Sequence, residues 1–241
     1  MNTLSIPSDI IINILVNLPI KTLLTTCQSN KKIYNVCNND YMWRLRITKE
    51  FGPTLELPKT TWKDWYFKLL LQPLSSFNIK RIANIKRHLI TNNAIMTLQK
   101  LLIPLLINLV STDNLEEYIT NNIPERLGTI ILAIYLYNID SHWLEKVKQL
   151  DQKHISHIDI NRINITLTNA LKLNDDNNSI TKIINFIVNE IIILSSHYIY
   201  IRNTNTITGK DIINGIKSDD EINSIISSVY PYWINNIPLI D

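Results

Sequence analysis

Residues 6–24 read IPSDIIINILVNLPIKTLL and are too apolar for a helix with one buried face. Between Pro7 and Pro19, apolar residues at helical spacing predict a buried stripe. Its members are Ile10, Ile11, Ile14, Leu15 and Leu18. Ile12 and Val16 lie outside this stripe, where a solvated helix would be polar. Either the rest of the chain or another protein must therefore cover the surplus.

The ends of this helix are marked by the sequence. Ser8 is the predicted N-cap, and Asp9 is favourable at the positive end of the helix dipole. Pro19 ends the helix, because proline cannot continue one and disfavours helical backbone in the preceding residue.

The composition favours an all-helical protein. The chain has 241 residues, of which 45% are hydrophobic, so a packed core is expected. Its four glycines never cluster, which excludes a glycine-rich phosphate loop and a dinucleotide-binding turn. Long apolar runs with few glycines are typical of helical bundles rather than of sheets rich in tight turns.

The net charge of +3 conceals two modules of opposite sign. Residues 1–89 carry 13 Lys and Arg against 5 Asp and Glu, which gives +8. Residues 90–241 carry 11 against 16, which gives −5, and the two values sum to +3. A basic front and an acidic back predict two modules with different partners.

The two cysteines predict neither a structural zinc cluster nor a disulfide framework. Cys27 and Cys37 lie ten residues apart and are the only thiols, so we expect reduced, buried side chains in an intracellular protein. Pro7 and Pro19 interrupt the first apolar stretch, which argues against a secretory signal. The longest uninterrupted apolar run, LLIPLLI at 101–107, is too short to span a bilayer.

Three short helices are predicted in the front module: the first, one from about Lys21, and one that carries Ile33 and Val36 and ends near Asn38. Together with CQSNKKIYNVC (27–37) and Trp43, the opening segment resembles the F-box, in the style of the F-box-like proteins of large DNA viruses. The stretch TWKDWYFKLL (61–70) is similar to the helix that commonly follows. The resemblance covers about residues 4–70.

This resemblance implies binding to the Skp adaptor of a cullin ubiquitin ligase. The implied contact residues are Ile6, Pro7, Ile10, Ile11, Ile14, Leu18, Pro19, Leu23, Leu24 and Trp43. The alternative is that they form a core with residues 60–90, and we prefer partner binding. A second group, Lys31, Lys32, Arg44, Arg46 and Lys49, is interpreted as a solvated face rather than a nucleic-acid site, because the sequence shows no aromatic stacking pattern.

A long helix is predicted in the back module. Apolar residues recur at 180, 183, 184, 187, 191, 194, 198 and 201, and further ones lie on other sides, so this helix should be central. Thr208 and Asp211 have the spacing of a capping box before a short helix that ends near Ile216. The stretch SDDEINSII (218–226) opens another helix.

Residues 158–227 resemble the histone fold, nearest to the core histone that carries the nucleosomal acidic patch. That resemblance implies DNA contacts at Arg162, Lys172 and Thr206, and an acidic patch formed by Glu190, Asp219, Asp220 and Glu221. The arginine that should pair with Asp211 is replaced by Thr204, and Arg202 lies two positions earlier.

The middle region could supply the partner that a histone fold needs. Residues 90–110 predict a long helix and 122–138 a loop with a further helix, so 77–150 could form a degenerate histone-fold half. Pro104 should kink or break the long helix. We prefer a generic helical bundle for this region.

No catalytic site, metal site or cofactor is predicted. His142, His154 and His157 could be drawn together with Asp151 and Asp159, but surface histidines explain them better. The acidic pairs are interpreted as caps and surface acids rather than general acid and base.

These observations predict an all-α, non-enzymatic adaptor with domains at 1–75, 76–150 and 151–241. A three-helix F-box would bind the Skp and cullin machinery, and a histone-like helical module would recruit a target, which could itself be a histone-fold protein. Nucleic acid is not favoured and no membrane is expected. The protein should work in the cytoplasm or nucleus, of a host cell if it is viral. The rival is a chromatin protein built from a fused histone pair with an appended F-box.

Overall fold

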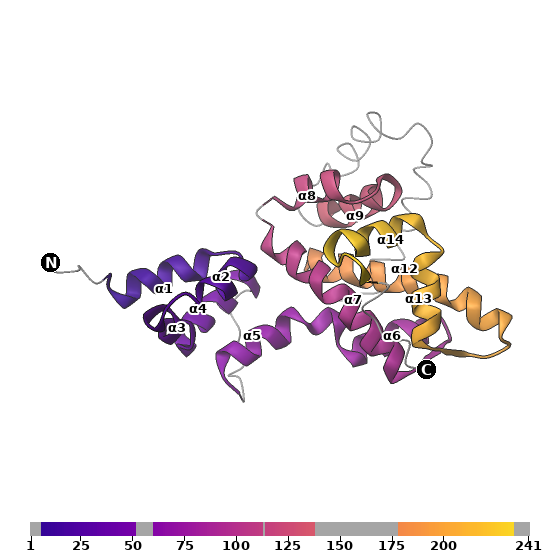
Figure 1. Cartoon of the computed structure of the whole chain (residues 1–241), viewed down its shortest axis with the longest axis horizontal. Coiled ribbons are helices and arrows are strands. Elements are labelled where there is room, and N and C mark those ends of the chain that lie inside the picture. Colours follow the sequence, from indigo (N-terminus) through magenta and orange to yellow (C-terminus); the bar gives the residue numbers. More distant parts are fainter. Residues whose placement is uncertain (1–5, 52–59, 113, 138–177, 234–241) are drawn as a thin grey trace. The chain divides into compact units, whose positions relative to one another are not determined.

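The computed structural model describes residues 6–51, 60–112, 114–137 and 178–233. The described residues are almost wholly helical, which confirms the predicted all-α class. The chain divides into two compact units, residues 1–72 and 73–241. Each unit is described by itself below (Figure 1).

The described part of the first unit contains five helices: α1 (Ser8–Asn17), α2 (Ile20–Thr26), α3 (Lys31–Cys37), α4 (Asp40–Phe51) and α5 (Trp62–Leu70). Pro7 and Pro19 are the N-cap residues of α1 and α2, and Ser8 is the first helical residue rather than the cap. The side chain of Asn30 caps α3 by accepting from the backbone N–H of Ile33 at 2.9 Å. The three predicted helices thus begin after Pro7, Pro19 and Asn30.

Aromatic side chains of α4 and α5 build the core of this unit. Trp43 is 1% exposed, and its ring lies 5.2 Å from that of Tyr66 and 5.6 Å from that of Phe67. Its indole Nε1 donates to the carbonyl oxygen of Cys37 at 2.6 Å, so the buried polar group is satisfied.

Cys27 and Cys37 form a disulfide, so the prediction of two reduced thiols was wrong for this structure. The bond joins the C-cap residue of α2 to the last residue of α3. Both side chains are buried, as expected, but spacing alone could not reveal that the turn between the helices brings them together.

The described part of the second unit consists of two halves, each of which contains a helix, a two-residue strand and a helix; the longer helix follows the strand in the first half and precedes it in the second. The first half has α6 (Ser76–Ile85), β1 (Leu89–Ile90) and α7 (Asn92–Ser111), followed by α8 (Leu115–Asn122) and α9 (Glu125–Tyr137). The second has α12 (Ser179–Ile201), β2 (Thr206–Ile207), α13 (Gly209–Lys217) and α14 (Asp220–Val229). A short 3-10 helix, η1 (Gln72–Leu74), precedes α6.

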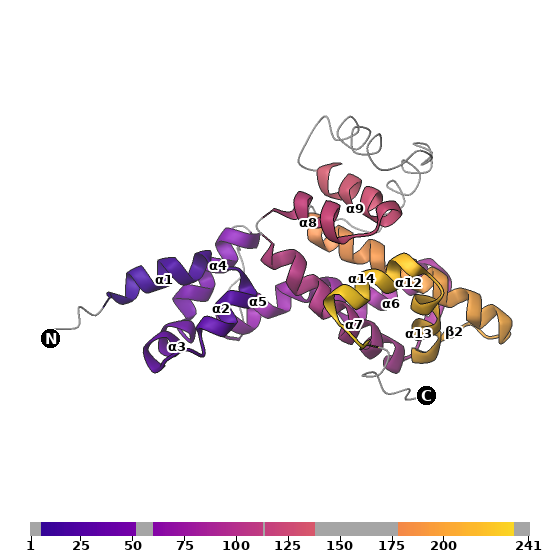
Figure 2. The ribbon, with the colours of Figure 1, turned by 45° about the horizontal axis from the view of Figure 1, so that its top comes forward.

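Helix α12 is central, as its apolar faces predict. It packs against α6, α7, α9 and α13, and it can be followed among them in Figures 1 and 2. Helices α7 and α12 are long and apolar enough to cross a bilayer by length and composition, although no single apolar run is. Because 61% of the apolar window of α12 is buried against other helices, it has the packing of a core helix.

A parallel pair of two-residue strands joins the two halves. Leu89 is opposite Thr206 and Ile90 is opposite Ile207. The backbone N–H of Leu89 donates to Asn205 at 2.9 Å, and that of Thr91 donates to Ile207 at 3.0 Å. This pairing fixes the loop after α6 beside the loop after α12.

Two local features test the sequence predictions: Pro104 contradicts one, and the start of α13 confirms another. Pro104 lies within α7 and does not end it, because packing of eight buried side chains outweighs the one lost backbone hydrogen bond. The predicted capping box is confirmed: Thr208 accepts from the N–H of Asp211, and Asp211 accepts from the N–H of Thr208.

Candidate partner-binding site

The buried face of α1 is formed by Ile11, Ile12, Leu15 and Val16. These side chains lie on the side of α1 that packs against α3 and α4. The pattern of adjacent pairs four residues apart is a helical stripe, and it shares Ile11 and Leu15 with the stripe that the sequence predicted.

The predicted assignment of the two faces was therefore partly wrong. Ile12 and Val16, which were expected on the outer side, are buried, whereas Ile10 and Ile14 are exposed. Both faces have helical spacing, so periodicity alone could not decide between them. The positions of α3 and α4 decide it.

Three isoleucines spaced by four residues form an exposed apolar stripe along α1 and the residue pair before it. Ile6, Ile10 and Ile14 are 54%, 50% and 53% exposed. Pro7 beside them is also exposed. The ammonium group of Lys32 in α3 donates to the carbonyl oxygen of Ile6 at 2.6 Å, which ties the residue before the N-cap of α1 to α3. We call Ile6, Ile10 and Ile14 the apolar stripe.

The other predicted contact residues divide into two groups. Leu18 and Pro19 at the turn between α1 and α2, together with Leu24 within α2, are half-buried and offer part of their surface. The remaining three, Ile11, Leu23 and Trp43, lie in the interior of the unit, where they shape the site without presenting surface. Contact with a partner stays a prediction for the exposed and half-buried residues.

One basic residue has a different role from the predicted solvated face. Arg46 is 2% exposed, and its Nη1 donates to the carbonyl oxygen of Leu18 at 2.7 Å. Its guanidinium also lies 5.3 Å from the ring centre of Tyr66. Arg46 therefore closes the C-terminal end of α1, where carbonyl groups lack helical partners. The others, Lys31, Lys32, Arg44 and Lys49, are exposed.

An apolar stripe in water on a small helical unit is a surface that a partner helix could cover. Burying three half-exposed isoleucines would contribute roughly 1 kcal/mol each, enough to anchor one helix of a partner. The comparisons agree with this interpretation.

Residues 3–45 match the family model of the F-box domain. The match covers α1–α3 and the first half of α4, and it contains all ten predicted contact residues. It implies a ubiquitin-ligase adaptor that binds a Skp subunit. No curated protein and no solved structure matched the chain.

The second unit holds a cluster of acidic side chains that is already paired. Arg126 of α9 donates to Asp219 at 2.8 Å and to Glu221 at 3.3 Å. Glu221 also accepts from the backbone N–H of Leu127 at 2.9 Å. Desolvation by burial opposes the charge of Arg126, but the two carboxylates outweigh it and raise its pKa. This arrangement ties α9 to the start of α14.

The other two predicted acidic-patch residues differ from this pair. Glu190 of α12 is half-buried, and this burial raises the pKa of its carboxyl above the ordinary 4.5. Asp220 is exposed in the first turn of α14. The structure thus brings Asp219 and Glu221 together around a cation rather than leaving four acids on an open surface.

Sequence inspection missed Arg126, although a signal was present. It is the only Lys or Arg between Lys100 and Lys146, and the other charged residues of that stretch are acidic, so this lone cation is a candidate for pairing with a carboxylate. Of the predicted DNA contacts, Thr206 is half-buried in β2, and Arg162 and Lys172 lie outside the described residues.

Metal binding gains no support within the described ranges. No group of three His, Cys, Asp or Glu side chains there could hold a metal ion. The histidines and acids considered from the sequence, His142, His154, His157, Asp151 and Asp159, lie outside those ranges.

Proposed function

We propose that this protein is an F-box adaptor that binds the Skp subunit of a cullin ubiquitin ligase through its first unit and recruits a target through its second. The supporting observation is the apolar stripe, which remains in water within the segment that matches the F-box domain. A partner helix that packed on Ile6, Ile10 and Ile14 would remove this apolar surface from solvent.

The experiment is co-purification with a Skp-type adaptor after co-expression. Ile10→Asp combined with Ile14→Asp should abolish binding, because two carboxylates would be buried without partners. The variant should still fold, since both side chains are half exposed. Asn13→Asp with Asn17→Asp is the matched control: it adds the same charge to exposed positions of α1 and should retain binding. Retained binding by the isoleucine variant would refute the proposal.

The layout of the second unit supports a histone-like pair as its architecture. Two halves of helix, strand and helix meet through the parallel pairing of β1 and β2, and α13 begins with a capping box. We infer that this pair presents a protein-binding surface. A target with a histone fold fits this surface type, and ubiquitination of the target is part of the same proposal.

The same observations favour one rival function, a chromatin-like DNA-packaging protein. Charge argues against it, because residues 150–241 carry 7 Lys and Arg against 10 Asp and Glu. Duplex binding is driven largely by phosphate neutralisation and falls steeply with salt. A duplex titration at several salt concentrations separates the two: the adaptor should bind weakly at all of them, whereas a packaging protein should give a steep salt slope.

A further inference from the structure

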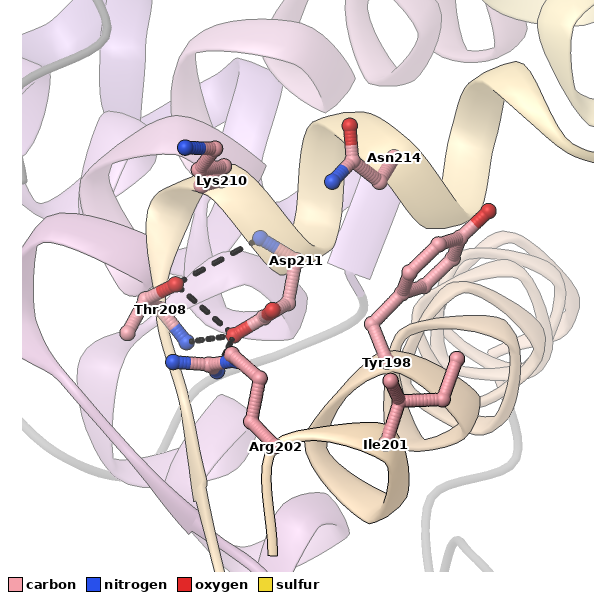
Figure 3. Close-up of a pocket in the computed structure, with 7 residues that line it drawn as sticks. All are labelled: Tyr198, Ile201, Arg202, Thr208, Lys210, Asp211 and Asn214. Carbon is pink, nitrogen blue, oxygen red and sulfur yellow. Dashed lines mark hydrogen bonds and ion pairs between the residues drawn. The ribbon is translucent and has the colours of Figure 1, made fainter. Parts of the chain in front are cut away.

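A pocket of about 380 Å³ lies between the C-terminal end of α12 and the first half of α13 (Figure 3). This volume is within the range of ordinary ligand pockets. Helix α12 and the residue after it supply Tyr198, Ile201 and Arg202, and the cap and first turns of α13 supply Thr208, Lys210, Asp211 and Asn214.

The carboxylate in this pocket is already satisfied. Asp211 is 3% exposed, and its Oδ2 accepts from Arg202 and from the backbone N–H and hydroxyl of Thr208 at 2.8 and 2.7 Å. Figure 3 shows these donors converging on one oxygen. The buried charge therefore calls for no added cation, and the pocket is not suited to a metal or a basic side chain.

One side of the pocket is apolar and open to water. Ile201 is 72% exposed, and the ring of Tyr198 lies beside it as a half-buried wall. Most of α12 before this turn is buried, so its end differs from the rest of the helix. An apolar wall in water is stabilised when another apolar group covers it.

The other side carries groups that can bind an anion and a peptide backbone. Lys210 is exposed, and neither its ammonium group nor the side-chain amide of Asn214 makes a hydrogen bond or ion pair with the described part of the chain. An amide both donates and accepts, so Asn214 can bond a peptide backbone in either direction. Arg202 is engaged by Asp211, which leaves Lys210 as the cation available in the described lining.

We propose that this pocket binds a short acidic segment of the target protein, in which a carboxylate side chain neighbours an apolar one. The carboxylate pairs with Lys210, and the apolar side chain covers Tyr198 and Ile201. Asn214 bonds the backbone between them. As a target site the pocket rests on the adaptor role proposed above, but binding of a peptide to it does not require the Skp subunit.

A protein segment suits this pocket better than duplex DNA does. A duplex presents many phosphates and gains affinity from several neutralising cations at once. The described lining offers one cation that is not already paired, beside an apolar wall that phosphates would leave uncovered. Charge complementarity and the wall together favour an anion joined to an apolar group.

The test is fluorescence polarisation of labelled peptides with the full chain. Four eight-residue probes, otherwise Gly and Ser, carry one Glu before or after one Phe or Leu, and matched probes carry Gln for Glu or Ser for the apolar residue. At least one acidic-apolar probe should bind, and its matched probes should not. Lys210→Glu should weaken this binding about tenfold or more, because like charges then face each other.

Two further variants and one further probe sharpen the test. Ile201→Ser, at a largely exposed position, should also weaken binding without unfolding the chain. Lys217→Glu is the matched control, since Lys217 is exposed on α13 outside the pocket and its loss should leave binding unchanged. A probe with Lys in place of Glu should recover binding to Lys210→Glu. Glutamate is favourable in the first turn of α13, so the Lys210→Glu variant should fold.

The proposal is overturned if no acidic-apolar probe binds, or if Lys210→Glu binds as well as the unchanged chain. It is also overturned if a 20-base-pair duplex binds instead and Lys210→Glu removes that binding. Skp co-purification, measured on the same preparations, keeps the two proposals separate. If the unchanged chain binds the Skp subunit but none of the acidic-apolar probes, the pocket proposal is refuted, whereas binding of a probe without binding of Skp refutes the adaptor role.

Discussion

Arg202 donates a hydrogen bond to the buried carboxylate of Asp211, which ties the end of α12 to the start of α13. The sequence resemblance placed this arginine two residues later, where the chain has Thr204. The turn makes the earlier position suitable: Asn203 has a φ of 52°, a left-handed conformation that asparagine tolerates, and it folds the chain back so that Arg202 faces Asp211.

Removal of the Asp211 carboxylate should destabilise the second unit. Asp211→Ala takes away the charged acceptor of Arg202 and half of the capping box, so we expect a loss of about 2–3 kcal/mol in the free energy of unfolding. Urea denaturation measures it. Asp220→Ala, at an exposed position of α14, is the control and should lose less than about 1 kcal/mol. Equal losses would contradict a specific role for Asp211.

Gly215 of α13 lies directly against Ser195 of α12. A Cβ at this position would lie 2.9 Å from the backbone nitrogen of Ser195 and 2.9 Å from its hydroxyl oxygen. Helix propensity alone predicts that Gly215→Ala stabilises by about 1 kcal/mol. We expect a net loss of about 1–3 kcal/mol instead, because backbone atoms would have to shift. Thermal melting decides the sign, with the exposed Ser224→Ala as a control that should be neutral or slightly stabilising.

The disulfide predicts a measurable dependence on reductant. Joining Cys27 to Cys37 closes a short loop in the unfolded chain, which should stabilise the first unit by about 2–3 kcal/mol. Purified without reductant, the chain should gain no iodoacetamide adduct, and after reduction it should gain two. Cys27→Ser with Cys37→Ser should lower the melting temperature and become insensitive to reductant. Two adducts without reductant would contradict the bond.

Periodicity predicted the long elements well. The expected stripe of about 24 residues became α12, which spans Ser179–Ile201, and the Thr208 and Asp211 spacing became a capping box. These features depend on neighbouring residues along one chain segment, so the sequence contains them. The helix at Leu115–Asn122 was missed, because its eight residues include only three apolar ones.

The buried face of a helix, and the residue pairs that form between distant segments, were harder to predict than the helices themselves. Helix α1 is apolar around most of its surface, and only the position of α3 and α4 determines that Ile12 is buried and Ile10 exposed. Arg126 meets Asp219 across 93 residues of sequence. Such contacts depend on tertiary packing, which the spacing of residues along one segment does not reveal. The same holds for Arg46, whose charge suggested a surface position.

The second unit should fold only when both halves are present. A fragment of residues 73–241 should be a monomer with a cooperative melt, whereas residues 151–241 alone should aggregate or dimerise. The reason is that α12 packs against α6, α7 and α9, which the shorter fragment lacks, so its apolar faces would be exposed. Size-exclusion chromatography with light scattering tests this. A monomeric, cooperatively melting 151–241 fragment would contradict the interdependence of the halves.

Glu190 should make the stability of the second unit depend on pH. Burial raises the pKa of its carboxyl above 4.5, and this effect exceeds the opposing hydrogen bond from Asn189 and the charges of Arg126 and Lys86. Between 4.5 and the raised pKa, the folded state therefore holds a proton that the unfolded state has released. Stability contributed by the neutral carboxyl is lost as the pH rises through that window.

Glu190→Gln isolates this contribution, because glutamine keeps the shape and the hydrogen-bonding partner Asn189 but cannot ionise. The difference in unfolding free energy between the variant and the unchanged chain should move in favour of the variant as the pH rises from 4 to 7, and then level off. Urea titrations at closely spaced pH values measure this difference directly. A difference that stays constant, or that moves in favour of glutamate with rising pH, would mean that the Glu190 carboxylate is stabilised by Arg126 more than it is penalised by burial.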